Sequence, residues 1–323
     1  MHGIPFLDYD AVIGAVSAKN AIAHTREAFL RHRAGDWVMP AKVYLPSPPY
    51  GDFRAMPALG DGYAMLKWIS SFPGNPARGL PTVMGVIVLS DAQTSEPLAL
   101  LDARSVTALR TGAVAAVAAR ALAARALAPA GARTCGIIGS GLHGAWAARC
   151  LAADGLGPGV CHDPRAELAH ALAAELGDGW RAGSLADALA CDVVTCVTPG
   201  SAPVVTAADL RPGMHLNMLG ADGPGKAEAT IDAVAACELY CDEWAQAAHG
   251  GELTGAVEAG LVGRGDVTDL GAVLAGEVAA PSGGERATLF DSTGLAIQDL
   301  AIAIAVYAAG MNSPTRSGPE GNA

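Results

Sequence analysis

Length, composition and charge already exclude several classes of protein. The chain has 323 residues, 51% of them hydrophobic and 16% charged, which is typical of a well-packed protein of two ordinary domains rather than a disordered one. The net charge of −11 and the lack of a basic patch argue against nucleic-acid binding, which needs concentrated Lys and Arg.

Targeting and redox signals indicate a cytoplasmic protein without a membrane span. The Ala-rich run over residues 112–132 is interrupted by Arg120 and Arg125, so we expect no membrane helix there. The first residues lack the charged and apolar regions of a signal peptide. The seven cysteines are odd in number and lack zinc-site spacing, so we expect reduced thiols and no metal site.

The first third of the chain predicts a helix followed by a sheet. Apolar residues recur at helical spacing over 8–34, and Asp8 stands where it can cap the first turn. A long Ala-rich helix is expected later, over 105–127. Between the two helices, consecutive strands predict a mostly antiparallel or mixed sheet. The five expected strands cover residues 42–45, 52–58, 63–69, 83–90 and 97–101.

A glycine-rich turn follows the next apolar strand, at 135–138. The turn reads Gly139-x-Gly141-x-x-Gly144 and leads directly into a helix, which is the setting that a dinucleotide-binding fingerprint requires. Gly139 permits the tight turn, Gly141 lets the backbone approach a pyrophosphate, and Gly144 lets helix and strand pack closely. The free N–H groups and the positive end of the helix dipole would face the phosphates.

Asp163 ends a second apolar strand, at 159–163, 19 positions after Gly144. A carboxylate there is typical of one that binds the ribose hydroxyls of NAD and repels the extra phosphate of NADP. The alternative is an aspartate that caps the helix beginning at Pro164. Arg165 is the one neighbour that would favour NADP, and we expect NAD.

The rest of the chain alternates helices and strands, as a doubly wound parallel sheet requires. The final helix, at 294–309, is strongly apolar, and the polar tail after Gly310 is expected to be disordered. The remaining expected helices cover 165–176 and 185–190, and the strands cover 192–198, 214–219 and 239–242. The fold class expected is therefore α/β, with a Rossmann domain and a second α+β domain.

Three basic residues of the first sheet are candidates for a polar site. Lys67 lies in an apolar run, where a lysine must be paired, functional or at a sheet edge in water. Burial would lower its pKa and suit it to proton transfer near neutral pH. Lys42 and Arg54 lie on neighbouring strands. Each alone is typical of a solvated strand face, but together they could clamp a carboxylate.

Asp222 follows the strand at 214–219. Ligands bind outside the carboxyl ends of such strands, so this acid stands where chemistry can occur. The alternative is a turn aspartate before Gly223-Pro224, which is very common. The residues alone do not separate the two readings.

Blocks of sequence spread over residues 5–310 resemble the ornithine cyclodeaminase and mu-crystallin family, and most closely its NAD-dependent alanine dehydrogenases. The order and number of the blocks make the resemblance specific at the level of the family. The matching blocks are Met39–Tyr44, Gly51–Pro57, Leu66–Trp68, Gly79–Met84, Thr107–Gly112, Gly220–Lys226 and Phe290–Asp299.

The resemblance implies roles for individual residues. Lys67 and Asp222 would be the catalytic acid/base pair, and Lys42, Arg54 and Arg110 would surround the substrate carboxylate. NAD would be the cofactor. The residues implied along it are Thr82, Arg110, Thr111, Gly139, Gly141, Leu142, His143, Gly144, Asp163, Thr198, Leu219, Gly220, Ala221, Lys226 and Ser292.

The resemblance also implies an organisation and an activity. A discontinuous substrate and dimerisation domain, residues 1–115 and 300–323, would join a Rossmann domain at 116–299, and two chains would form a homodimer. The strand at 52–58 carries no glutamate, unlike cyclodeaminases. This favours net oxidation or reduction, in which a small L-amino acid, expected to be L-alanine, is interconverted with its 2-oxo acid and ammonia. The alternatives are a cyclodeaminase or imine reductase of the same fold, and a non-catalytic NAD(P)H-binding protein.

Overall fold

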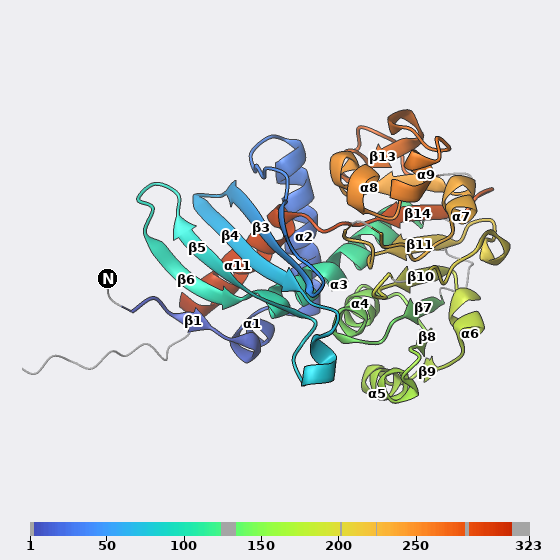
Figure 1. Cartoon of the computed structure of the whole chain (residues 1–323), viewed down its shortest axis with the longest axis horizontal. Coiled ribbons are helices and arrows are strands. Elements are labelled where there is room, and N and C mark those ends of the chain that lie inside the picture. The colour runs from blue at the N-terminus through green and yellow to red at the C-terminus, as the bar shows by residue number, and fades with distance from the viewer. Residues whose placement is uncertain (1–2, 124–133, 201, 224, 282–283, 312–323) are drawn as a thin grey trace, which may run out of the picture.

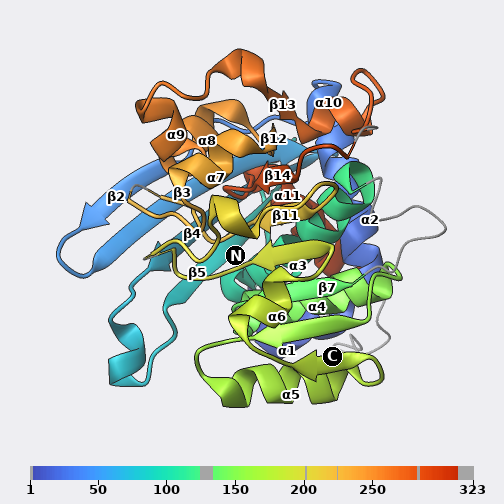
Figure 2. The same cartoon turned by 90° about the vertical axis from the view of Figure 1, so that its right-hand side faces the viewer.

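The chain folds into two lobes, each built around one sheet (Figures 1 and 2). The computed structural model describes residues 3–123, 134–200, 202–223, 225–281 and 284–311. The end of the long helix expected over 105–127 and nearly all of the expected polar tail lie outside these residues. None of the helices within the described ranges is long and apolar enough to cross a membrane.

The N-terminal segment forms two helices where the sequence predicted one. These are α1 (Tyr9–Ala15) and α2 (Ala18–Arg33). The Asp8 side chain caps α1, as predicted, by accepting a hydrogen bond from the Ala11 N–H at 2.9 Å. Ser17 caps α2 in the same way, accepting from the Asn20 N–H at 3.2 Å. A second capping residue inside the apolar pattern therefore divides the helix.

The first sheet has six strands in the order β1-β6-β5-β4-β3-β2. Only β1 and β6 pair in parallel, so the mixed sheet predicted from the sequence is confirmed. The two-residue strand β1 was missed because it is too short to show an alternation. The strands are β1 (Phe6–Leu7), β2 (Val43–Ser47), β3 (Gly51–Gly60), β4 (Tyr63–Ser71), β5 (Val83–Asp91) and β6 (Pro97–Asp102).

One face of the first sheet packs against helices α3 (Ala103–Leu122) and α11 (Ala296–Met311), and α2 packs on these two helices. Alternate residues of the strands, such as Met56, Met65 and Ile87, are buried on this face. Thus α11 returns from the end of the chain to the first lobe. The division of domains at 115/116 and 299/300 stays a prediction, and its boundaries fall inside α3 and α11.

The second sheet has eight strands, all parallel, in the order β13-β12-β14-β11-β10-β7-β8-β9. The order reverses at β7, which lies between β8 and β10. This is the doubly wound arrangement predicted from the sequence. The strands are β7 (Cys135–Ile138), β8 (Gly159–His162), β9 (Trp180–Ala182), β10 (Val193–Cys196), β11 (His215–Met218), β12 (Glu238–Cys241), β13 (Val267–Asp269) and β14 (Thr288–Asp291).

Helices cover both faces of this sheet. Gly136 of β7 meets α6, where an added Cβ would lie 2.1 Å from the Ala188 carbonyl oxygen, while Ile137 faces Gly144 of α4. The sequence missed β9, β13, β14 and α7 to α10, because short elements leave little periodicity. The helices are α4 (Leu142–Ala153), α5 (Ala166–Leu176), α6 (Leu185–Leu189), α7 (Ile231–Ala236), α8 (Trp244–Gly250), α9 (Thr254–Glu258) and α10 (Leu270–Leu274).

Candidate active site

The three glycines of the turn after β7 have the environments that a dinucleotide site requires. Gly139 has a φ of 96°, and a Cβ there would lie 2.6 Å from the Val197 carbonyl oxygen. A Cβ on Gly144 would lie 1.7 Å from the Gly139 oxygen. By contrast, a Cβ on Gly141 would meet no atom within 4 Å. Gly139 and Gly144 are therefore needed for the fold, whereas Gly141 leaves its backbone open to a ligand.

The helix α4 begins at this turn without a side-chain cap. Gly141 is its N-cap residue, so no side chain accepts from the first N–H groups. These donors and the positive end of the helix dipole point to the place where β7 and β10 part. Since Gly139 touches Val197 just after β10, the turn lies at the switch point of the sheet. These features fit a bound pyrophosphate.

Asp163 directly follows β8, beside the glycine turn. Its Oδ2 accepts from the Ser140 N–H at 3.0 Å, and its Oδ1 accepts from the Arg165 N–H at 2.9 Å. The Arg165 Nε also lies 3.2 Å from Oδ1. The carboxylate therefore holds the turn before α5. It does not cap the helix as the alternative proposed, because α5 begins at Ala166 with Arg165 as its N-cap residue and has no side-chain cap. The same contacts fix it next to the glycine turn, as ribose binding requires.

A pocket between the lobes brings together residues that are far apart in the sequence. Its predicted members come from both lobes, and Met56, Ile69, Ser70, Ser71, Val83, Thr107 and Thr293 complete the lining. The predicted residues that line it are Lys42, Arg54, Lys67, Arg110, Thr111, His143, Leu219, Asp222 and Ser292. Those outside its lining are Thr82, Gly139, Gly141, Leu142, Gly144, Asp163, Thr198, Gly220, Ala221 and Lys226.

The strand register explains why the basic residues meet. Met56 of β3 pairs with Lys67 of β4, and Arg54 pairs with Ile69, so the two basic side chains are diagonal neighbours on the buried face. Lys42 immediately precedes β2, whose first pair is Val43 with Ala55. The three cations therefore project from one face of the sheet into one cavity, as the sequence suggested.

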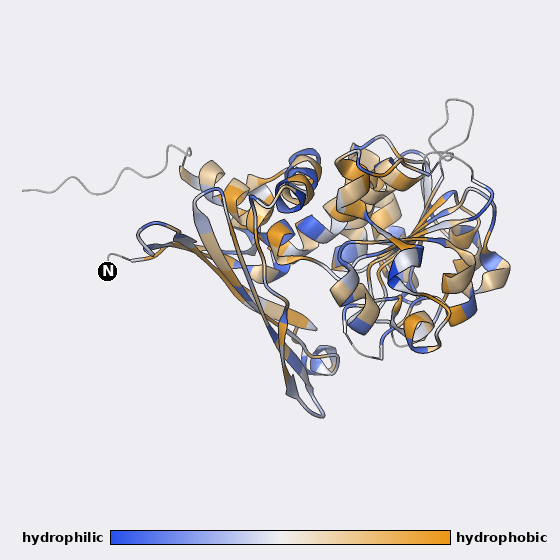
Figure 3. Cartoon of the chain, turned by 90° about the horizontal axis from the view of Figure 1, so that it is seen from above, coloured by the Kyte–Doolittle hydropathy of each residue, from blue (hydrophilic) through white to orange (hydrophobic). Residues whose placement is uncertain are grey.

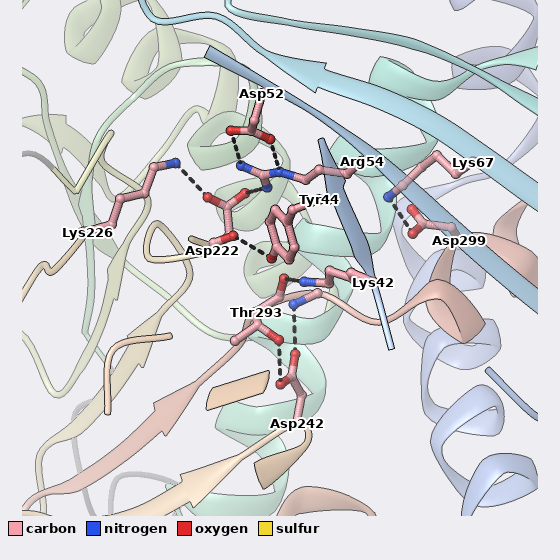
Figure 4. A network of polar contacts seen from close by, with 11 residues as sticks. Lys42, Tyr44, Asp52, Arg54, Lys67, Asp222, Lys226, Asp242, Thr293 and Asp299 are labelled. Carbon is pink, nitrogen blue, oxygen red and sulfur yellow. Dashed lines mark hydrogen bonds and ion pairs between the residues drawn. The ribbon is translucent and has the colours of Figure 1, made fainter. Parts of the chain in front are cut away.

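Lys67 is buried and bound to an acid that the sequence analysis did not single out. Its Nζ donates to Asp299 Oδ2 of α11 at 2.5 Å, and both side chains are at most 1% exposed (Figure 4). Asp299 Oδ1 lies 3.3 Å from Arg110 Nε. Burial lowers the pKa of Lys67 to about 7, with Arg110 acting in the same direction and Asp299 against it. Lys67 therefore titrates near neutral pH.

Lys42 makes a different contact. Its Nζ donates to the Thr293 carbonyl oxygen at 2.5 Å. Burial lowers the pKa of Lys42 to about 8, while Asp242 and Asp222 oppose that shift. Asp242 accepts from the Ser292 and Thr293 hydroxyls and from the Gly294 N–H, which orders the loop that holds Lys42.

Asp222 belongs to a separate ion cluster that joins the lobes. Its Oδ2 accepts from Arg54 Nη1 at 2.5 Å, and its Oδ1 accepts from Lys226 Nζ at 2.6 Å (Figure 4). Asp52 holds the other side of Arg54, at 2.6 Å from Nε. Burial raises the pKa of Asp222, but Arg54 and Lys226 outweigh it and hold that pKa well below its usual range. The carboxylate bound to Lys67 is Asp299 and not Asp222.

The carboxyl ends of β10 and β11 are joined by a buried glutamate that the sequence analysis also missed. Glu228 accepts from the Thr198 N–H at 2.6 Å and from the Gly220 N–H at 2.7 Å. A Cβ on Gly220 would lie 2.3 Å from the Thr198 carbonyl oxygen, so the two predicted residues touch. Ala221 is fully buried beside them. Glu228 thereby fixes the positions of the two loops that follow β10 and β11.

His143 lies at the first turn of α4 and lines the pocket. Burial lowers its pKa to about 4, with Arg110 acting in the same direction. The ring is therefore neutral near pH 7. Thr82 is partly buried in the loop before β5, where its carbonyl oxygen accepts from the Phe72 N–H at 2.8 Å.

Comparison with known proteins matches the chain to one family. The sequence model of the ornithine cyclodeaminase/mu-crystallin family matches residues 6–313. An alanine dehydrogenase of Archaeoglobus fulgidus is 39% identical over 306 residues, 93% of each chain. A Δ1-pyrroline-2-carboxylate reductase of Bacillus cereus is 30% identical over 90% of this chain and 92% of its own. The solved structure of an archaeal alanine dehydrogenase dimer with bound NAD has a TM-score of 0.89 and 38% identity, covering 95% of this chain and 96% of its own.

Proposed function

The chain belongs to the ornithine cyclodeaminase/mu-crystallin family, and we propose that it is an NAD-dependent oxidoreductase that interconverts L-alanine with pyruvate and ammonia. One observation carries the proposal. Lys67, a buried lysine that titrates near neutral pH, lines the same pocket as Arg54 and Arg110, and this pocket lies at the end of the sheet that would bind the dinucleotide. This combination supplies a proton carrier, a carboxylate site and a cofactor site in one place.

NAD is the cofactor. The exposed backbone at Gly141 and the uncapped start of α4 would hold the pyrophosphate, and Asp163 would bind the ribose hydroxyls. The carboxylate of Asp163 would also repel a 2′-phosphate, which favours NAD over NADP. When bound, the nicotinamide accepts a hydride from the substrate Cα or returns one.

The substrate carboxylate would bind the cations of the first lobe. Arg54 and Arg110 can each grip a carboxylate with two N–H groups, and Lys42 adds a third positive charge. Arg54 already binds Asp222, so the substrate carboxylate would compete with Asp222 for the guanidinium. Asp52 would keep Arg54 oriented during this exchange, because it holds the opposite side of the group.

Lys67 would move protons during oxidation. In its neutral form it takes a proton from the amino nitrogen as the Cα–H bond breaks, which leaves an imine. Water then adds to the imine carbon. Lys67 gives its proton to the nitrogen and, neutral again, removes the carbinol proton as the C–N bond breaks and ammonia leaves. Asp222 stays ionised across the working pH, and we propose that it orders the attacking water as a hydrogen-bond acceptor.

Strand β3 carries no glutamate, and its one acid, Asp52, is bound to Arg54 and does not line the pocket, which supports a substrate with one amino group. That strand presents Arg54 and Met56 to the cavity, whereas a cyclodeaminase substrate needs an acid for its second amino group. Imine reduction without net loss of ammonia is the main alternative, because a pyrroline-2-carboxylate reductase is also a relative. A protein that binds the cofactor without turnover would have no need of a buried titrating lysine.

A substrate panel tests the proposal directly. Purified protein is incubated with NAD and L-amino acids, or with NADH, ammonia and 2-oxo acids, while absorbance of the reduced cofactor is followed. We expect turnover of L-alanine and of pyruvate with ammonia. Faster reduction of cyclic imines without ammonia would assign a reductase. Tight NADH binding without turnover of any substrate would assign a binding protein.

We also propose a cytoplasmic homodimer. In Figure 3 the first sheet has helices on one side, and no described helix covers its other face. That face carries apolar side chains at least 37% exposed, and Trp68 stacks there on Phe53 with ring centroids 5.5 Å apart. All seven cysteines are free and buried, which suits a reducing compartment. The exposed residues of this face include Val43, Leu45, Leu66, Trp68 and Met84.

Light scattering tests the dimer. A chain of 32.4 kDa should give about twice that mass at micromolar concentration if this face pairs with a second copy. Leu66→Lys together with Trp68→Glu should shift the mass toward the monomer. A monomeric wild type, or a dimer that survives both substitutions, would contradict the proposal.

A further inference from the structure

Asp299 is a fully buried acid in an otherwise apolar helix. It lies in the first turn of α11, where the helix dipole stabilises a negative charge. Removing an ionised carboxylate from water is costly unless it is paired, so its partners must account for it. The partners are two cations of the proposed active site, Lys67 and Arg110.

We propose that Asp299 is a positioning residue for proton transfer: it fixes the ammonium group of Lys67 and the guanidinium of Arg110 on one buried carboxylate and keeps Lys67 able to hold its proton. This inference rests on the proposed function, in which Lys67 is the proton carrier. Asp299 itself does not line the pocket, so it would act through the two cations rather than on the substrate.

The contacts divide between the two carboxylate oxygens. Oδ2 accepts the hydrogen bond from Lys67 Nζ at 2.5 Å. Oδ1 lies 3.3 Å from Arg110 Nε but forms no hydrogen bond, and Arg110 Nε has no hydrogen-bond partner either. Lys67 is thus the hydrogen-bonded partner, and Arg110 is held by charge. Gln298 Oε1 accepts from Arg110 Nη1 at 3.5 Å and limits its movement.

The charges around Lys67 show why the carboxylate is needed. Arg110 of α3 and Lys42 before β2 both disfavour the ammonium form, and His143 of α4 is neutral near pH 7. Burial acts in the same direction as the two cations. Asp299 is the largest opposing influence on Lys67. Without it, Lys67 would lose its proton well below neutral pH and could not serve as the acid in the reductive direction.

Lysine NMR gives a test that does not depend on turnover. The chain has only four lysines, Lys19, Lys42, Lys67 and Lys226, so protein labelled with ¹³C at lysine Cε gives few signals, assigned by single Lys→Met variants. In the wild type the Lys67 signal should titrate near pH 7. In Asp299→Asn its midpoint should fall by about 1–3 pH units, the usual effect of a close opposite charge.

Two further variants separate positioning from a general structural role. Asp291→Asn, another fully buried aspartate, should leave the Lys67 midpoint unchanged. Asp299→Glu keeps the charge but moves the carboxylate, so the midpoint should stay near the wild-type value while kcat falls about 10–100-fold. This variant also keeps the inference testable if Asp299→Asn does not fold, which circular dichroism would show.

The tests of Asp299 and the substrate panel can fail independently of each other. An unchanged Lys67 midpoint in Asp299→Asn, an equal shift in Asp291→Asn, or wild-type kcat in Asp299→Glu would each overturn the inference. Failure of the wild type to turn over any amino or imino acid would overturn the proposed function. In that case the NMR titration would still report whether Asp299 controls the protonation of Lys67.

Discussion

Two clusters of charged residues face the same pocket, but they differ in protonation. Lys67 in one cluster can gain or lose a proton near neutral pH, whereas Asp222 in the other stays ionised. Lys67 shares one carboxylate with Arg110 in a fully buried site, so burial wins and the pKa of the lysine falls to about 7. Asp222 contacts Arg54 and Lys226, and the attraction of these two cations outweighs burial, so the pKa of Asp222 is held well below its usual range. Each carboxylate contacts two cations, so the difference lies in burial: Lys67 and Asp299 are at most 1% exposed, whereas Lys226 and Asp222 are 26% and 33% exposed.

Because of this difference, Lys67 and Asp222, which were predicted to act as an acid/base pair, have different roles. Lys67 is poised to gain and lose a proton near neutral pH, whereas Asp222 is fixed as an anion. The first cluster lies within the first lobe, between β4 and α11, while the second joins the lobes (Figure 4). A change in the first should alter proton transfer, and a change in the second should alter substrate binding and the ordering of the attacking water.

The largest expected effect comes from Lys67→Met. General acid–base catalysis is worth about 10²–10⁴-fold in rate, and kcat should fall by that factor. NADH binding should be preserved, because the glycine turn and Asp163 are untouched. Steady-state kinetics with a fluorescence titration of NADH checks both. A kcat near the wild-type value would mean that Lys67 is structural and that the chemistry lies elsewhere.

Lys42→Met provides the matched lysine in the same pocket. If Lys42 holds the carboxylate equally in the ground and transition states, its loss should raise KM and leave kcat nearly unchanged. The rise should be about 10–100-fold, since a hydrogen bond to a charged group is worth about 1.5–3 kcal/mol. A loss confined to kcat would place Lys42 in the proton transfer and weaken the contrast with Lys67.

Asp163→Ser tests the cofactor side. Removal of the carboxylate should weaken NAD binding about tenfold and relax the discrimination against NADP, because both the ribose contact and the repulsion of the 2′-phosphate are lost. Kinetics with the two cofactors at equal concentration measures the ratio. If the wild type already works faster with NADPH, Arg165 rather than Asp163 decides the preference.

Stability should also depend on the protonation of Lys67. The folded pKa of Lys67 is lower than its unfolded value, so the unfolded chain binds more protons between about pH 7 and pH 10. The free energy of unfolding should therefore rise with pH over this range, by at most about 1.4 kcal/mol per unit for one group. Lys67→Met should lose this rise. Denaturant titrations at pH 7 and pH 9 compare the two proteins, and equal slopes would contradict the lowered pKa.

Sequence analysis singled out those residues that stand out in a clear local pattern. Lys67 was found because a charge interrupts an apolar strand, and the glycine turn because its spacing is tied to a strand and a helix. Asp299 breaks an apolar helix in the same way. It was not singled out, because an acid in the first turn of a helix is ordinary. The same test applied to helices would have found it.

Other parts of the site could not be read from the chain. Glu228 and Asp242 act through backbone N–H groups and hydroxyls of distant segments, and only the folded structure brings these together. The contact of Asp222 with Arg54 depends on how the two lobes meet, and no local sequence pattern predicts that. Strand β14 lies near the middle of the second sheet, yet its four residues gave no usable periodicity.

The pH dependence of oxidation tests the central claim most directly. Lys67 must be neutral to accept a proton, so kcat for L-alanine oxidation should rise with pH through a midpoint near 7, and the residual activity of Lys67→Met should lack that step. In the reductive direction the activity should instead fall above the same pH. A wild-type profile without a step near pH 7, or an identical step in Lys67→Met, would show that Lys67 is not the proton carrier.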